Sequence, residues 1–207
     1  LTPSVESRLM AHDAVAPPQT VAHLARTHLI SDPVALPAAN CVVSELPDFS
    51  VYEDVSIKKA QFFGYLIPLV QAENQRLTAI RQRLIYIYDH VRWQRELNAA
   101  DRTWLEQVTA DFRFRHTDPT DPDFWVAALE CVDSVPEDLV LVQAANESGW
   151  GTSRFSLEGN NLFGQWCFGE GCGMVPEERP ADATYEVARY DSVSESIASY
   201  IHNLNTG

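Results

Sequence analysis

Residues 144–164 read A-A-N-E-S-G-W-G-T-S-R-F-S-L-E-G-N-N-L-F-G and join the end of an apolar run to a glycine-rich, aromatic turn. Upstream, Ser134 and Glu137 have the S-x-x-E spacing of a capping box, with Pro136 just inside the start of the predicted helix. An apolar stripe follows at Leu139, Leu141, Val142 and Ala145, and Gly149 and Gly151 then break the helix. The pattern therefore places Glu147 near the last turn of a mostly buried helix.

Glu147 is the first candidate for chemistry. Desolvation raises the pKa of a carboxylate that lies against apolar surface, and such a group suits general acid catalysis near neutral pH. The alternative is an ordinary helix-end glutamate in solvent, which the spacing alone leaves equally open.

The whole stretch carries a resemblance. E-S-G-W-G-T-S-R-F (147–155) followed by G-N-N-L-F-G (159–164) resembles the signature of bacterial cell-wall glucosaminidases, the family that includes the flagellar peptidoglycan hydrolase. The segments 58–74, 164–168, 171–173 and 185–190 are similar to its Bax subgroup in Gram-negative bacteria, so the resemblance runs from about Asp54 to the C-terminus. It implies that Glu147 is the general acid and that the N-L-F-G segment, with Asn161, Phe163 and Gly164, shapes the sugar groove.

Two tryptophans extend the expected substrate site. Trp150 and Trp166 lie in glycine-flanked loops, where an exposed ring can stack on the face of a sugar. Phe163 is close to Glu147 as well, although a role in the core is the simpler interpretation of that side chain.

Glycoside hydrolysis normally uses a second carboxylate, and the resemblance implies that it lies on a β-hairpin facing the acid. We rank Glu177 and Glu178 ahead of Glu186 for this role. Attack by the substrate's own acetamido group is the alternative and needs no protein nucleophile. The family pattern also implicates Tyr190, which could equally anchor the hairpin to the last helix.

Composition limits the classes of function. The chain has 207 residues, 45% hydrophobic and 21% charged, which predicts one domain (51–207) with an N-terminal Pro/Ala-rich arm (1–50). The net charge of −14 argues against nucleic acid as a partner, because phosphate contacts need a basic face. The chain starts at Leu1 without a charged leader or an apolar run of membrane-spanning length, so we expect a removed export signal or a trimmed chain.

The four cysteines allow a disulfide interpretation. Cys167 and Cys172 flank a glycine-containing loop that could close a small disulfide, which would leave Cys41 and Cys131 to pair. Zinc is the competing interpretation, but no C-x2-C spacing or histidine cluster supports it. His116 lies near Asp118 and Asp121 in a proline-rich loop, where capping and turn roles are the better explanation than a metal.

Periodicity predicts the remaining elements. Helices are expected over 56–92, with Pro68 bending or dividing it, over 98–112, over 124–132 and over 193–204. Charged residues of the longest helix should form a solvated face: Lys58, Lys59, Glu73, Arg76, Arg81 and Arg83. A β-hairpin is expected over Val175–Tyr190, with its turn at 180–182.

These observations predict a mainly α (α+β) fold, a lysozyme-like helical domain with a small β-hairpin lobe. The resemblance implies an exported endo-β-N-acetylglucosaminidase of the periplasm or cell envelope that cleaves peptidoglycan glycan strands without a cofactor or metal. A muramidase or lytic transglycosylase on the same fold, or a non-catalytic peptidoglycan-binding protein, stays open. The oligomeric state and the preferred glycan do not follow from the sequence.

Overall fold

The computed structural model of the 207-residue chain describes residues 46–177, 179–180 and 182–207. The expected N-terminal arm, with Cys41, therefore lies almost wholly outside the described residues. Within the described part the chain divides into two compact units, one built from Ile80–Val132 and the other from residues 46–79 and Asp133–Gly207. The boundaries predicted for the arm and the domain stay a prediction.

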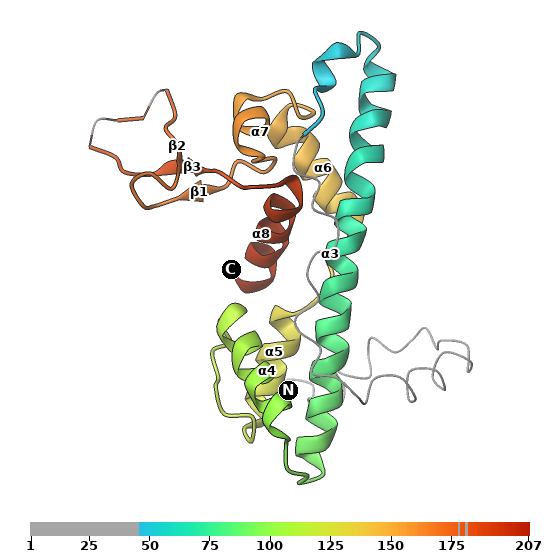
Figure 1. The fold of residues 1–207 in the computed structure, drawn as a ribbon, viewed down its shortest axis with the longest axis vertical. Coiled ribbons are helices and arrows are strands. Elements are labelled where there is room, and N and C mark those ends of the chain that lie inside the picture. The colour runs from blue at the N-terminus through green and yellow to red at the C-terminus, as the bar shows by residue number, and fades with distance from the viewer. Residues whose placement is uncertain (1–45, 178, 181) are drawn as a thin grey trace, which may run out of the picture. The chain divides into compact units, whose positions relative to one another are not determined.

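The described fold is mainly helical, as expected (Figure 1). It has six α-helices, one short 3-10 helix and one three-stranded sheet. No helix in this part of the chain is both long enough and apolar enough to cross a membrane.

The longest helix, α3 (Val55–Arg92), contributes to both units. Pro68 lies inside it, and the helix is not divided there. Proline removes one backbone hydrogen bond, but Leu66, Leu69 and Val70 are buried on either side of it and hold both halves of the helix in place.

The unit formed by Ile80–Val132 holds α4 (Ala99–Asp111) and α5 (Pro122–Cys131). Asn98 and Asp121 cap these helices, so the capping role expected for Asp121 is confirmed. Buried aromatic residues dominate this core: Trp104, Phe112, Phe114, Phe124 and Trp125.

Several residues expected on a solvated face of α3 form hydrogen bonds or ion pairs with other protein groups instead, which corrects that prediction. Arg81 donates to the backbone carbonyls of Leu129 and Val132 at the end of α5. Arg83 pairs with Asp101 at 2.9 Å. Glu73 is only 3% exposed, and both of its oxygens accept hydrogen bonds from Arg76, at 2.8 and 2.7 Å. Helical spacing cannot reveal these partners, because most of them belong to other elements.

The second unit contains the 3-10 helix η1 (Phe49–Val51), the first part of α3, and helices α6 (Glu137–Ser148), α7 (Arg154–Gly159) and α8 (Val193–Thr206). Its sheet lies on the side of α7 and α8 that faces away from α3 (Figure 1). Buried apolar side chains from each helix fill the core, among them Phe62, Leu66, Val140, Leu162, Ile197 and Ile201.

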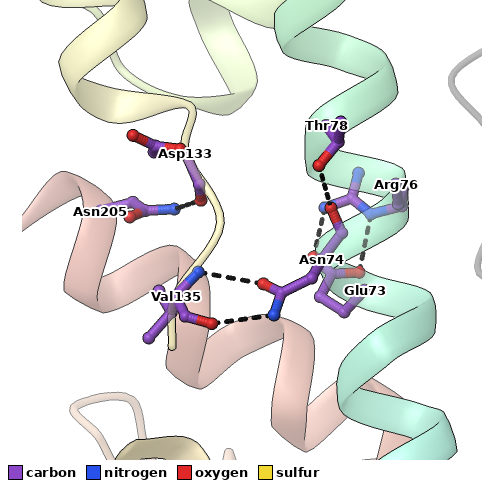
Figure 2. Close-up of polar contacts among 7 residues, drawn as sticks. All are labelled: Glu73, Asn74, Arg76, Thr78, Asp133, Val135 and Asn205. Atoms are coloured by element: carbon purple, nitrogen blue, oxygen red, sulfur yellow. Dashed lines mark hydrogen bonds and ion pairs between the residues drawn. The ribbon is translucent and has the colours of Figure 1, made fainter. Parts of the chain in front are cut away.

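The capping box expected before α6 is not formed. Pro136 is the N-cap and makes no side-chain hydrogen bond, while Glu137 accepts one from Gln71 of α3. The segment ahead of the helix is held by distant amides instead (Figure 2). Asn74 donates to the carbonyl of Val135 at 2.8 Å and accepts from its N–H at 3.0 Å, and Asn205 donates to the carbonyl of Asp133 at 2.7 Å.

The sheet has the order β1-β3-β2, with both pairs antiparallel. Its strands are β1 (Trp166–Cys167), β2 (Gly173–Met174) and β3 (Glu186–Ala188). The hairpin prediction is therefore corrected in two ways: its first strand ends at Met174 instead of starting at Val175, and β1 adds a third strand. Strands of two residues are too short to show the alternation on which the prediction relied.

Candidate active site

The end of α6 has the turn that its glycines predict. Gly149 is the left-handed C-cap with φ 58°, and Trp150 and Gly151 also have positive φ angles, 62° and 76°. The buried hydroxyl of Ser148 donates to the carbonyl of Ala144 and accepts from the N–H of Gly151 at 2.7 Å. These contacts turn the chain sharply after Glu147, which lies in the last turn of the helix as expected.

The side chain of Glu147 is exposed, so the expected burial against apolar surface is wrong. The last turn of α6 buries Ala144, Ala145 and Ser148 and leaves Glu147 on the opposite face. Its Oε1 accepts a hydrogen bond from Nε2 of Gln143 at 2.9 Å. Its Oε2 points toward Gly164, where an added Cβ would lie 3.5 Å from this oxygen.

Tyr200 of α8 contributes to the surroundings of Glu147. Burial raises the pKa of Tyr200, and the negative charge of Glu147 raises it further. The ring of Tyr200 stacks on Phe163, with centroids 4.1 Å apart and planes within 2°. Phe163 is itself buried, which agrees with the simpler interpretation of a core residue.

Asn161 organises the turn that brings Gly164 to Glu147. The side chain is 1% exposed, and its Nδ2 donates to the carbonyls of Gln165 and Ala188 at 2.9 and 2.8 Å. Its Oδ1 accepts from the N–H groups of Phe163 and Gln165 at 3.3 and 3.1 Å. The amide therefore holds backbone on two segments, and its contribution to a sugar site is the shape of the turn.

The two candidate tryptophans differ in exposure. Trp150 packs edge-on against Phe62 and Phe63, and Lys59 lies 4.8 Å from its ring centroid. Trp166 is 51% exposed and meets Tyr185 only edge-on. Trp166 thus offers the ring face that stacking on a sugar requires, whereas Trp150 is half-buried against α3.

The three candidate second carboxylates lie in different settings. Glu186 is buried and accepts from the N–H groups of Gly171 and Gly173 at 3.1 and 2.8 Å, with Arg179 at 3.7 Å. These amide hydrogen bonds lower the pKa of Glu186, and Arg179 adds a smaller effect. Glu177 is exposed on the connection between β2 and β3, and Glu178 lies outside the described residues.

Cys167 and Cys172 form the expected disulfide. Their sulfurs and the Glu186 carboxylate lie within 4.8 Å of one another, a spacing that would suit a metal ion if the cysteines were thiolates. The disulfide ties up both sulfurs, so this group does not fit a metal site. Among the described residues Cys131 has no disulfide partner, and its expected pairing with Cys41, which lies outside them, stays a prediction.

Tyr190 is joined to α8 by hydrogen bonds. Its hydroxyl contacts Gln165 Nε2 and Ser199 Oγ, each at 3.0 Å, and its backbone carbonyl accepts from Asn160. Burial raises the pKa of Tyr190, and the hydrogen bond with Ser199 opposes the rise. The hydroxyl therefore makes the contacts expected of an anchor between the hairpin and the last helix.

The structure thus brings Glu147, Gly164 and Phe163 together and adds two residues that the sequence reasoning missed, Gln143 and Tyr200. Gln143 lies four residues before Glu147, a helical spacing that would have identified it. No local pattern marks Tyr200, because only the packing of α8 brings it to this site.

Comparison with known proteins gives a family. Residues 125–207 match the glucosaminidase family model, described as mannosyl-glycoprotein endo-beta-N-acetylglucosaminidase. The chain is also 32% identical over 163 residues to Protein bax of Escherichia coli (strain K12), an alignment that covers 79% of this chain. The aligned region spans 56% of the length of that relative.

No solved structure gives a significant match to the chain. The family is lysozyme-like, in keeping with the helical body and small antiparallel sheet described above. The part of the chain that carries Glu147, the N-N-L-F-G turn and the sheet therefore belongs to the glucosaminidase family, and the chain is a homologue of Protein bax.

Proposed function

We propose that this protein is an endo-β-N-acetylglucosaminidase that cleaves the β-1,4 bond between N-acetylglucosamine and N-acetylmuramic acid in peptidoglycan, with Glu147 as the general acid. The observation that carries the proposal is the position of Glu147 within the matched family segment. Its carboxyl group is exposed at the end of α6, with Oε2 toward the backbone of Gly164.

The reaction needs a proton donor for the leaving oxygen and a group that stabilises or attacks the anomeric carbon. Glu147 supplies the first. Glu186 is poorly placed for the second, because two backbone amides and Arg179 already engage its carboxylate. Glu177 and Glu178 therefore remain the protein candidates, beside attack by the acetamido group of the substrate.

The proposed compartment is the periplasm or cell envelope. The Cys167–Cys172 disulfide supports it, because disulfides persist in oxidising compartments and are rare in the cytosol. The net charge of −14 gives no attraction to the carboxylates of peptidoglycan stem peptides, so binding would depend on stacking at residues such as Trp166 and on hydrogen bonds.

The test is digestion of purified peptidoglycan, followed by borohydride reduction and mass spectrometry of the new fragment ends. Reduced N-acetylglucosamine ends are expected. Reduced muramic ends or anhydro ends would replace the proposal with a muramidase or a lytic transglycosylase. Folded protein that binds peptidoglycan but releases no fragments would point to a binding protein instead.

The same assay tests Glu147. Glu147→Gln should retain the fold and lose roughly 10²-fold or more in rate, the scale of a general acid. Glu158→Gln is a matched control, because Glu158 is exposed on α7 and has no part in the proposed chemistry. Fragment release by Glu147→Gln at the wild-type rate would remove Glu147 from the mechanism.

A further inference from the structure

Gln143 lies one helical turn before Glu147 on α6, and its Nε2 donates to Oε1 of Glu147 at 2.9 Å. Among the residues that the structure describes, this is the hydrogen bond that Glu147 receives. An exposed glutamate at a helix end otherwise samples several rotamers. The amide of Gln143 is only partly exposed, so it offers a more constrained donor than water does.

The two oxygens of Glu147 have different surroundings. Oε1 faces the amide of Gln143, and Oε2 faces Gly164, where the absence of a side chain leaves space. In a protonated carboxyl group, the carbonyl oxygen accepts a hydrogen bond better than the hydroxyl oxygen does. When Glu147 is protonated, the hydrogen bond from Gln143 therefore favours Oε1 as the carbonyl oxygen and Oε2 as the oxygen that carries the proton, on the side of the N-N-L-F-G turn.

The chemistry of the donor fits this arrangement. A lysine or arginine at position 143 would hold a neighbouring carboxylate in its charged form, whereas a general acid must carry a proton. A glutamine orients the carboxyl group without adding a charge.

We propose that Gln143 is a positioning residue that holds Glu147 so that its acidic proton, on Oε2, points to the Gly164 side, where the glycosidic oxygen binds. This inference rests on the proposed function, because it assumes that Glu147 is the general acid. Gln143 itself acts through Glu147 and needs no contact with the substrate.

The test compares Gln143→Met, which is similar in length but has no donor, with the wild-type chain in peptidoglycan turnover. We expect kcat to fall roughly tenfold, the scale of one lost hydrogen bond, with KM within twofold of the wild-type value. Gln143→Ala should show the same fall in kcat and the same small change in KM. The matched control is Gln71→Met, which removes a glutamine-to-glutamate hydrogen bond at the other end of α6, to Glu137, and should leave kcat unchanged.

A double-mutant cycle separates positioning from a structural role. In the Glu147→Gln background, Gln143→Met should cause no further loss of rate, because the residue through which it acts is gone. A further tenfold loss in that background would show a structural role and overturn the inference. A wild-type kcat in both Gln143 variants, with Glu147→Gln slowed as proposed, would overturn it and leave the proposed function intact. Full activity of Glu147→Gln would instead overturn the proposed function.

Discussion

Glu147 and Glu186 are two glutamates of one unit with opposite surroundings. Glu147 is exposed and meets one neutral amide donor, whereas Glu186 is buried and accepts from two backbone N–H groups near Arg179. The backbone amides lower the pKa of Glu186 by favouring its charged form, which suits a structural anchor. The residue type is the same, so the surroundings alone separate the buried anchor Glu186 from the exposed candidate Glu147.

Gly164 provides a test at the scale of one residue. Its φ of +62° disfavours any side chain, and an alanine Cβ would lie 3.5 Å from Oε2 of Glu147. Gly164→Ala should lower the free energy of unfolding by about 1–2 kcal/mol through backbone strain. It should also slow turnover, because the methyl group would occupy the side from which the substrate approaches.

Urea denaturation and fragment release measure the two effects. Gly169→Ala is the control, because its added Cβ has a nearest neighbour at 3.9 Å and its φ is not in the positive range. Gly164→Ala with a wild-type turnover would show that the substrate does not approach Oε2 from this side.

At the scale of elements, the β lobe is held by contacts other than strand pairing. Its strands contain two or three residues each, which gives few ladder hydrogen bonds. The Cys167–Cys172 disulfide closes the connection between β1 and β2, and Glu186 of β3 binds the N–H groups of Gly171 and Gly173 on that connection. The resulting loop presents Phe168, which is 81% exposed, beside Trp166.

The lowered pKa of Glu186 should make the stability of the fold depend on pH. Its pKa in the folded chain lies below the ordinary value of 4.5, because the amides of Gly171 and Gly173 stabilise the charged form. Its contribution to stability is therefore present above about pH 4.5 and is lost as the pH falls through the folded pKa.

Glu186→Gln should have a lower Tm than the wild-type chain at pH 7, and the difference should shrink as the pH falls below 4.5. Thermal unfolding at a series of pH values measures the difference in Tm and its change with pH. Glu170→Gln, exposed on the same loop, serves as the control. A difference in Tm that stays constant down to pH 3 would show that the charge of the Glu186 carboxylate does not stabilise the fold.

At the scale of the molecule, long-range amide contacts hold the segment that precedes α6. Asn74 of α3 and Asn205 of α8 hold residues 133–135 by their backbone (Figure 2). This segment leads into α6, so two distant elements hold the chain just ahead of the helix that carries the candidate acid.

Asn74→Ala should destabilise the fold by roughly 2–4 kcal/mol, because the N–H and the carbonyl of buried Val135 both lose their partner. The urea midpoint measures this loss. Thr78→Ala, which removes a hydroxyl contact within α3 itself, should change stability by less than about 0.5 kcal/mol. Equal effects of the two substitutions would show that the clamp on Val135 contributes little.

Features encoded by neighbouring residues were predictable. The helix end at Glu147, the left-handed glycine at position 149, the cap at Asp121 and the disulfide between Cys167 and Cys172 all depend on residues a few positions apart. The exposure of Glu147 was predicted wrongly, because burial depends on which face of α6 meets the other helices.

The sequence by itself thus determined the helical class of the protein, the family segment and the place of Glu147 at a helix end, because helix periodicity, glycine turns and short motifs are local properties. Only the tertiary structure decided that Glu73 and Glu186 are buried anchors, that Asn161 shapes a turn and that Tyr200 lies near Glu147. The physical reason is that tertiary packing decides which polar side chains are buried, and a buried polar group must find a partner, whether that partner is near in sequence, as Arg76 is for Glu73, or distant, as Ala188 is for Asn161.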